Sequence, residues 1–193
     1  MLIEPFQALL SSYIPLDPRE RDYLVRMHEL ALSPSPFERG QFTPGHFTAS
    51  AFVLDPSRSS LLLILHKKLG LWLQPGGHVD PTDERAFAAA CREVAEETGV
   101  SALLPLLAGE SIFDIDIHRI PARRDEPAHE HFDVRFAFVA ERAALTENEE
   151  VAAARWVPLV DVAKVTQDES VLRAVRKLLA GSADWTNPAP REF

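Results

Sequence analysis

The chain has 193 residues, of which 46% are hydrophobic, so it can form one domain with an ordinary core and is too apolar for a wholly disordered protein. Its formal net charge of −9 argues against a nucleic-acid backbone or an anionic membrane as the main partner, because both bind basic surfaces. An acidic protein that handles a phosphate compound needs cations between the two, which makes a metal site the expected solution.

The single cysteine, Cys91, excludes a disulfide within the chain and fits a reducing compartment. We interpret it as a core residue, because it falls on the apolar stripe of a predicted helix. The first residues lack the basic segment of a signal peptide, and the longest aliphatic run, Leu61 to Leu65, is too short to span a bilayer. We therefore expect a cytoplasmic protein that does not contact a membrane.

Residues 1–40 predict an N-terminal helical extension. Asp17 is an expected N-cap, and Pro18 suits the first helical position after it. Apolar residues then recur at helical spacing until Pro34 and Pro36 end the helix.

Residues 41–181 predict the main domain, and residues 182–193 an irregular tail. The Gln74-Pro75-Gly76-Gly77 segment is expected as a loop, and a capping box of Thr166 and Glu169 opens the last helix. This order predicts an α+β fold, in which helices cover a mixed sheet. Strands are expected at residues 46–54, 60–66, 71–73, 113–118, 131–138 and 155–157, and helices from about Asp83 to Thr98 and after Thr166.

The helix expected from about Asp83 to Thr98 carries three glutamates on one side. Glu93, Glu96 and Glu97 fall within about 100° of one another around the helix axis. Like charges four residues apart cost about 0.2–0.5 kcal/mol, and a divalent cation between them would remove that cost. A solvated acidic face is the alternative, and the helix by itself does not separate the two interpretations.

Two features beside this helix favour the metal site. The glycines of Pro75-Gly76-Gly77 allow backbone carbonyls to approach a ligand. Arg92 precedes Glu96 by one helical turn and can hold that carboxylate in place. Mg²⁺ takes only a few protein oxygens, together with waters and substrate phosphate, so one loop carbonyl and the helix carboxylates would suit it.

The segment Gly77-x6-Glu84-x7-Arg92-Glu93-Val94-Ala95-Glu96-Glu97-Thr98-Gly99-Val100 resembles the box of the Nudix hydrolases, although that family has five residues where this chain has six before Glu84. The flanking elements extend the resemblance over roughly residues 46–165. The resemblance implies an α/β/α sandwich. It also implies a Mg²⁺-dependent pyrophosphohydrolase, with Mn²⁺ as a substitute ion, that cleaves a phosphoanhydride bond in a nucleoside diphosphate linked to another group.

The resemblance also implies roles for single residues. Glu150 would be a catalytic base in a late acidic loop, for which a solvated loop is the alternative. Glu84 would brace the loop before the helix, and Gly77 and Gly99 would be structural. Catalysis is assigned to Arg92, Glu93 and Glu150, and metal binding to Glu93, Glu96, Glu97 and the carbonyl oxygen of Gly76.

The polar faces of two alternating strands could line a substrate cleft. Arg135 could hold a phosphate, and a histidine could contact a base or ribose. A solvated sheet face with ion pairs across strands is one alternative. A zinc site made by His129 and His131 with His78 or His118 is another. The expected substrate contacts are His46, His78, His131, Asp133 and Arg135.

The substrate class stays open among nucleotide sugars, dinucleoside polyphosphates and nucleoside triphosphates. The chain could instead be a Nudix-fold nucleotide-binding or regulatory module with weak catalysis. The intact Arg92, Glu93, Glu96 and Glu97 favour the hydrolase, because a module that only binds has no need of crowded carboxylates. A homodimer is compatible with the resemblance.

Overall fold

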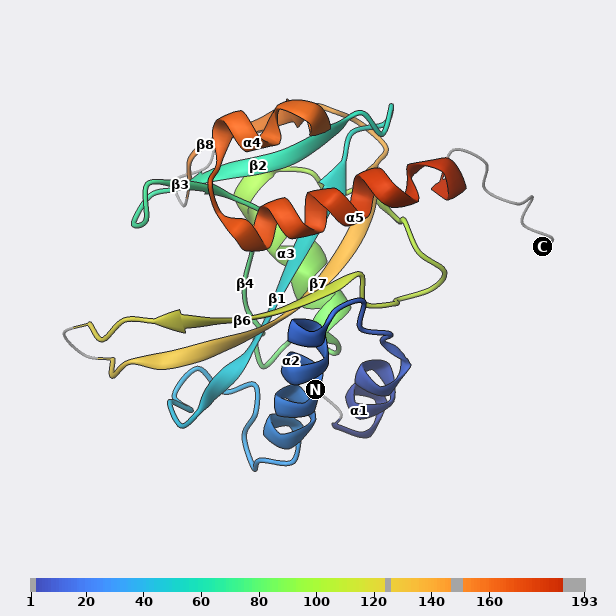
Figure 1. Cartoon of the computed structure of the whole chain (residues 1–193). Coiled ribbons are helices and arrows are strands. Elements are labelled where there is room, and N and C mark those ends of the chain that lie inside the picture. The colour runs from blue at the N-terminus through green and yellow to red at the C-terminus, as the bar shows by residue number, and fades with distance from the viewer. Residues whose placement is uncertain (1–2, 124–125, 147–150, 186–193) are drawn as a thin grey trace.

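The computed structural model describes residues 3–123, 126–146 and 151–185 (Figure 1). No helix in these ranges is long and apolar enough to cross a membrane. The helices are α1 (Ile3–Ser12), α2 (Pro18–Ala31), α3 (Ala86–Thr98), α4 (Val162–Val165) and α5 (Glu169–Trp185), with a 3₁₀ turn, η1 (Leu159–Asp161), before α4. The strands are β1 (Gly45–Leu54), β2 (Ser60–His66), β3 (Leu71–Leu73), β4 (Gly76–His78), β5 (Leu103–Pro105), β6 (Asp114–Ile120), β7 (His129–Ala140) and β8 (Val151–Pro158).

The described strands form one mixed sheet, as the sequence predicts. Its central path is β3-β2-β1-β7-β5, with β4 paired to β1, β6 to β7 and β8 to β2. β1 and β7 run parallel with His46 opposite His131, and the other pairs are antiparallel. Gly76 and Gly77, expected in a loop, instead belong with His78 to strand β4, which lies opposite Thr48–Ser50 of β1.

Alternate side chains of the central strands pack on opposite faces of the sheet. On β7, Phe132, Val134, Phe136 and Phe138 join the buried cluster that contains α1, α2 and α3. Val139, with Ala137, joins the cluster that contains α5. Figure 1 shows α3 and α5 on opposite sides of the sheet. The predicted sandwich of a mixed sheet between helices is therefore confirmed.

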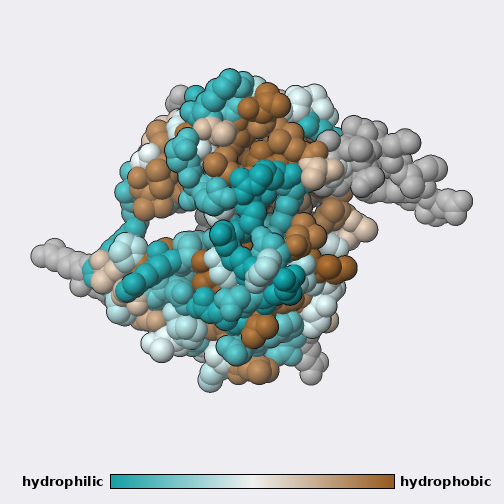
Figure 2. Space-filling model, viewed as in Figure 1, coloured by the Kyte–Doolittle hydropathy of each residue, from teal (hydrophilic) through white to brown (hydrophobic). Residues whose placement is uncertain are grey.

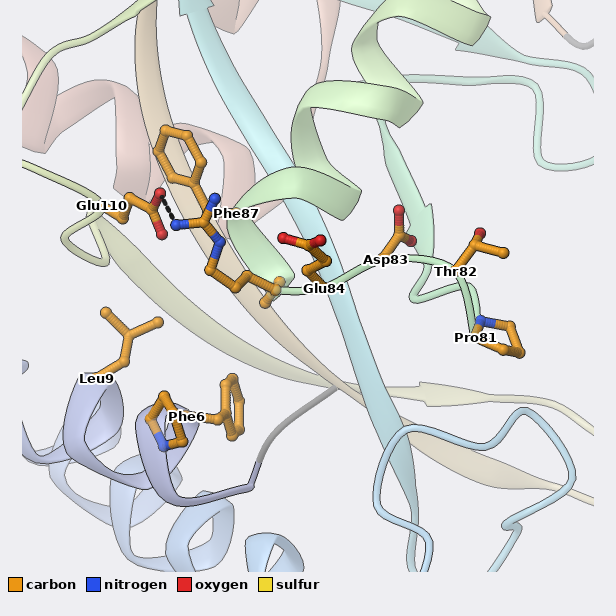
Figure 3. A pocket seen from close by; sticks show the side chains of 11 residues that line it. Phe6, Leu9, Pro81, Thr82, Asp83, Glu84, Phe87 and Glu110 are labelled. Carbon is orange, nitrogen blue, oxygen red and sulfur yellow. Dashed lines mark hydrogen bonds and ion pairs between the residues drawn. The ribbon is translucent and has the colours of Figure 1, made fainter.

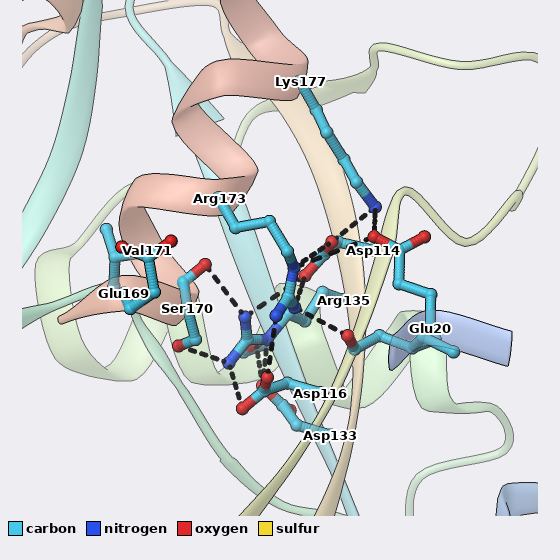
Figure 4. Close-up of polar contacts among 12 residues, drawn as sticks. Glu20, Asp114, Asp116, Asp133, Arg135, Glu169, Ser170, Val171, Arg173 and Lys177 are labelled. Carbon is cyan, nitrogen blue, oxygen red and sulfur yellow. Dashed lines mark hydrogen bonds and ion pairs between the residues drawn. The ribbon is translucent and has the colours of Figure 1, made fainter. Parts of the chain in front are cut away.

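Buried ion pairs join the N-terminal helices to the rest of the chain (Figure 4). Glu20 of α2 is fully buried, and its Oε1 lies 2.6 Å from Nζ of Lys177 on α5. The same Nζ lies 2.6 Å from Oδ1 of Asp114 on β6. The hydroxyl of Tyr13 donates a hydrogen bond to Oε2 of Glu20 at 2.7 Å. The predicted helical extension thus packs against β6 and α5.

The start of α5 differs from the sequence-based prediction. Oδ1 of Asp168 accepts hydrogen bonds from the backbone N–H groups of Ser170 at 2.9 Å and Val171 at 3.2 Å, so Asp168 caps the helix. Glu169 pairs with Arg176 instead of reaching back to Thr166, so the predicted capping box was wrong. The helix also continues to Trp185, into the segment that was expected to be an irregular tail.

Candidate active site

The acidic side of α3 lies against the short strand β4. Glu97 is 8% exposed, and its Oε2 accepts a hydrogen bond from the backbone N–H of Gly76 at 3.0 Å. A Cβ atom on Gly77 would lie 2.8 Å from Oε1 of Glu93, so only glycine lets that carboxylate approach the strand so closely. Strand β4 therefore brings its backbone against two of the three glutamates expected to bind metal.

Arg92 ties the carboxylates of this helix together. Its Nη1 donates to Oε2 of Glu96 at 2.8 Å, which confirms the ion pair predicted one helical turn apart. The same Nη1 donates to Oε1 of Glu93 at 2.9 Å, and Nη2 donates to the carbonyl oxygen of His78 at 3.0 Å. Hydrogen bonds to Asp83 and Glu93 raise the pKa of Arg92 above its ordinary value, so the guanidinium stays protonated and positively charged.

Asp83, and not Glu84, makes the contacts that brace the loop before α3. Asp83 is 7% exposed, its Oδ2 lies 2.9 Å from Nη2 of Arg92, and the same oxygen accepts from the N–H of Asp80 at 2.8 Å. This turn explains why α3 begins at Ala86 and not near Asp83. Five residues separate Asp83 from Gly77, the glycine that opens the box, so the family's spacing was present in the sequence with aspartate in place of glutamate.

Glu84 faces a different part of the surface. It is exposed, and Figure 3 shows it among the side chains that line a hollow between α1 and the loop. Phe6 and Leu9 of α1 form the opposite wall of this hollow. The bracing role expected for Glu84 is accordingly reassigned to its neighbour.

The three glutamates of α3 open into a cleft of about 1780 Å³. Figure 2 shows hydrophilic surface gathered around a hollow on this side of the molecule. The cleft extends from α3 and β4 to the turn after β2 and to the β6–β7 hairpin. Among the expected substrate contacts it is lined by His78, His131, Asp133 and Arg135, but not by His46.

Arg135 lies at the buried end of the cleft within the ion-pair cluster of Figure 4. The residue is 1% exposed, and its Nε donates to Asp133 at 2.8 Å. Its Nη1 and Nη2 lie 3.2 Å and 3.3 Å from Asp114 and Asp116. Because three buried aspartates already neutralise this guanidinium, we assign it a structural role and do not retain the expected contact with a phosphate.

The aspartates around Arg135 are buried and held by several partners, so this polar sheet face is not solvated. Burial alone would raise the pKa of Asp116, but the charge of Arg135, the hydrogen bond with His118 and the charge of Arg173 outweigh it and hold that pKa below its ordinary value. Asp133 accepts hydrogen bonds from the hydroxyl groups of Thr48 at 3.0 Å and Ser50 at 2.7 Å. Asp133 is therefore occupied by protein partners at the floor of the cleft.

Histidines gather at the adjoining end of the sheet. His46 is fully buried, whereas His78 and His131 are partly exposed to the cleft. Burial lowers the pKa of His46 below its ordinary value, that of His78 to about 4 and that of His131 to about 2. These three rings are therefore neutral near pH 7, and the burial of His46 argues against the direct substrate contact expected for it.

The late acidic loop lies outside the described residues. It holds Glu150, the expected base, with Glu147 and Glu149. The described chain resumes at Val151, the first residue of β8.

Comparison with known proteins agrees with the resemblance. A family model described as NUDIX domain matches residues 44–178. A Bacillus subtilis (strain 168) protein named "Putative 8-oxo-dGTP diphosphatase" is 35% identical over 112 residues, which cover 58% of this chain and 66%, just under two thirds, of that relative.

Three solved structures share the fold. A C. elegans Ap4A hydrolase in a binary complex has a TM-score of 0.54 at 20% identity, covering 72% of this chain and 98% of the other. The NUDIX domain of Shewanella oneidensis NrtR, complexed with ADP ribose, has a TM-score of 0.53 at 21% identity, covering 83% of this chain and 97% of the other. The E. coli dihydroneopterin triphosphate pyrophosphohydrolase has a TM-score of 0.56 at 17% identity, covering 70% of this chain and 95% of the other.

Proposed function

We propose, from the premise that the chain belongs to the Nudix hydrolase family, that it is a pyrophosphohydrolase acting on a nucleoside diphosphate derivative. Water attacks one phosphorus atom, and the phosphoanhydride bond to the leaving phosphate breaks. The observation that carries this proposal is the packing of Glu93 and Glu97 against the glycine strand β4, with Arg92 bonded to Glu93 and Glu96.

The groups around β4 suit a hard divalent cation. Glu93, Glu96 and Glu97 offer carboxylate oxygens, and Gly76, whose N–H bonds Glu97, would add its carbonyl oxygen. An oxygen-only set of few protein ligands is what Mg²⁺ prefers, and Mn²⁺ would substitute. Such an ion would neutralise phosphate charge and lower the pKa of the attacking water.

The remaining roles belong to the chain's own side chains. Arg92 would keep Glu93 and Glu96 in fixed positions before the substrate arrives, which removes part of the cost of organising the reaction. A glutamate would accept the proton of the attacking water. We assign that step to Glu93 or to Glu150 of the late acidic loop, and Arg92 acts by positioning.

Cations at the mouth of the cleft support an anionic substrate. Lys67 and Lys68, in the turn after β2, are exposed and line the cleft, and exposed Arg119 of the β6–β7 hairpin lines it as well. Basic side chains that line an active-site cleft of an acidic protein favour the entry of phosphates. His78 and His131 line the same cleft, and His78 would contact the nucleoside part of the substrate.

The test is a panel with one compound from each open class, namely 8-oxo-dGTP, Ap4A and ADP-ribose. The name of the Bacillus subtilis relative makes 8-oxo-dGTP the first compound to test. Products would be separated by chromatography with Mg²⁺ and with a chelator, and ¹⁸O-labelled water would identify the phosphorus that is attacked. We expect Mg²⁺-dependent cleavage of at least one compound. Tight binding with no cleavage of any of them would favour a nucleotide-binding module.

A further inference from the structure

Four neighbouring strands place histidines at one end of the sheet. His46 of β1 and His118 of β6 both lie opposite His131 of β7 in the strand registers. His129 lies two residues before His131, on the same side of β7, and His78 comes from β4. The centroids of neighbouring rings lie between 4.8 Å (His46 to His131) and 5.3 Å (His118 to His131) apart. These are five of the seven histidines of the chain.

The rings of His46 and His129 are each held by a hydrogen bond between Nδ1 and a backbone carbonyl oxygen, which leaves Nε2 for a ligand. Nδ1 of His46 lies 3.1 Å from the carbonyl oxygen of Gln41, and Nδ1 of His129 lies 2.8 Å from that of Pro127. Because a carbonyl oxygen only accepts, each Nδ1 carries the proton and each Nε2 offers a lone pair. Metal-binding histidines are held in this way by a partner on the second nitrogen.

The second ring nitrogen of His46, Nε2, is buried without a bonding partner in the part of the chain that the structure describes. The residue is fully buried, and among the described residues its Nε2 has no hydrogen-bond partner. An unsatisfied buried polar atom costs about 1–3 kcal/mol, so it points to a ligand. One ring nitrogen from each of His46, His129 and His131 lies within 4.8 Å of the other two.

We propose that His46, His129 and His131 form a site for a transition-metal ion of the zinc class, separate from the carboxylate site on α3. The sequence suggested His129 and His131 with His78 or His118, whereas the third residue brought within reach is His46 of β1. Tetrahedral coordination at about 2.0–2.1 Å requires the nitrogens to approach to about 3.4 Å, so binding would draw the three rings closer together.

Ligand chemistry selects the ion. Three neutral imidazoles suit Zn²⁺, Co²⁺ or Cu²⁺ far better than Mg²⁺, which prefers oxygen ligands. The fully buried His46 forms the back of the site, and His129 and His131 line the cleft. Three protein ligands leave a fourth position for water or an anionic group of the substrate, and that position faces the cleft.

This site does not depend on the proposed hydrolysis, so the test measures metal binding directly. Metal-free protein is titrated with Co²⁺ without substrate, and visible absorption is recorded, because tetrahedral Co²⁺ absorbs strongly and octahedral Co²⁺ weakly. We expect one tetrahedral ion per chain that Zn²⁺ displaces. His131→Gln and His129→Gln should each lower the affinity for Co²⁺ by roughly 100-fold or more.

Two control variants locate the ion. His28 lies on α2, outside the cluster, so His28→Gln should leave the cobalt spectrum unchanged. Glu97→Gln should also keep the tetrahedral band, even where phosphate release is lost. The proposal is overturned if wild-type protein gives only the weak octahedral spectrum, or if the band survives both His131→Gln and His129→Gln. The wild-type spectrum decides the matter even if a histidine variant fails to fold.

Discussion

Oδ2 of Asp83 lies 2.9 Å from Nη2 of Arg92, which joins the loop before α3 to the guanidinium that holds two carboxylates of the helix. Nη1 of the same guanidinium forms ion pairs with Glu93 and Glu96. A single buried aspartate is thus linked through Arg92 to two of the glutamates on the acidic face of the helix.

Loss of the Asp83 charge should therefore impair catalysis although Asp83 is not a catalytic residue. We expect Asp83→Asn to lower kcat/KM by about 10- to 100-fold, as the loss of a partner behind a metal ligand typically does. Glu84→Gln is the matched control, because Glu84 is exposed and lies next to Asp83 in sequence. Steady-state kinetics of the two variants would decide, and equal losses in both would contradict the reassignment.

The glycine at position 77 should be needed for metal affinity. A Cβ atom there would lie 2.8 Å from Oε1 of Glu93, so Gly77→Ala should push that carboxylate aside. We expect the Mg²⁺ concentration for half-maximal activity to rise by about tenfold or more. Gly40→Ala is the control, since nothing lies within 4 Å of its added Cβ. An unchanged Mg²⁺ requirement in Gly77→Ala would show that Glu93 does not bind the ion in this position.

The buried ion pairs of α2 should contribute strongly to stability. Glu20→Gln leaves Lys177 and Arg173 without a charge that lies 2.6 Å and 3.7 Å from them, so the free energy of unfolding should fall by about 3–5 kcal/mol. The exposed pair of Asp161 and Lys164 provides the contrast. Asp161→Asn should change the free energy of unfolding by no more than about 1 kcal/mol. Urea denaturation followed by circular dichroism would measure both. Similar effects of the two substitutions would argue against tight docking of α2.

The thiol of Cys91 should be unreactive in the folded protein. Burial raises its pKa to about 11, so at pH 8 only about one thiol in a thousand is ionised, and the fraction increases as the pH rises towards that value. Reaction with a disulfide reagent should be slow in the native state and fast in urea. Rapid native labelling at pH 8 would contradict the interpretation of Cys91 as a core residue.

Local periodicity explains which parts of the structure were readable from the sequence. The alternation of Phe132, Val134, Phe136 and Phe138 predicted the two faces of β7, and helical spacing predicted the pairing of Arg92 with Glu96. Both depend only on residues close together in the chain.

Contacts between distant segments explain what the sequence missed. Arg135 looked free to hold a phosphate because its partners Asp114 and Ser170 are 21 and 35 residues away. The approach of His46 to His131 depends on the parallel register of β1 and β7, which no local pattern encodes. Asp83 is different, because five residues separate it from Gly77, which is the family's spacing, so the sequence alone could have identified it.

Glu97→Gln tests the central claim most directly. Glu97 is nearly buried against β4, and glutamine has the same shape and can still accept the hydrogen bond from Gly76, so the fold and melting temperature should stay close to those of the wild type. The substitution removes one carboxylate from the site on α3. We predict that Mg²⁺-dependent release of product from the best substrate of the panel falls by at least roughly 100-fold in a normally folded protein. Wild-type turnover by that variant in Mg²⁺ would contradict the assignment of these glutamates to catalysis.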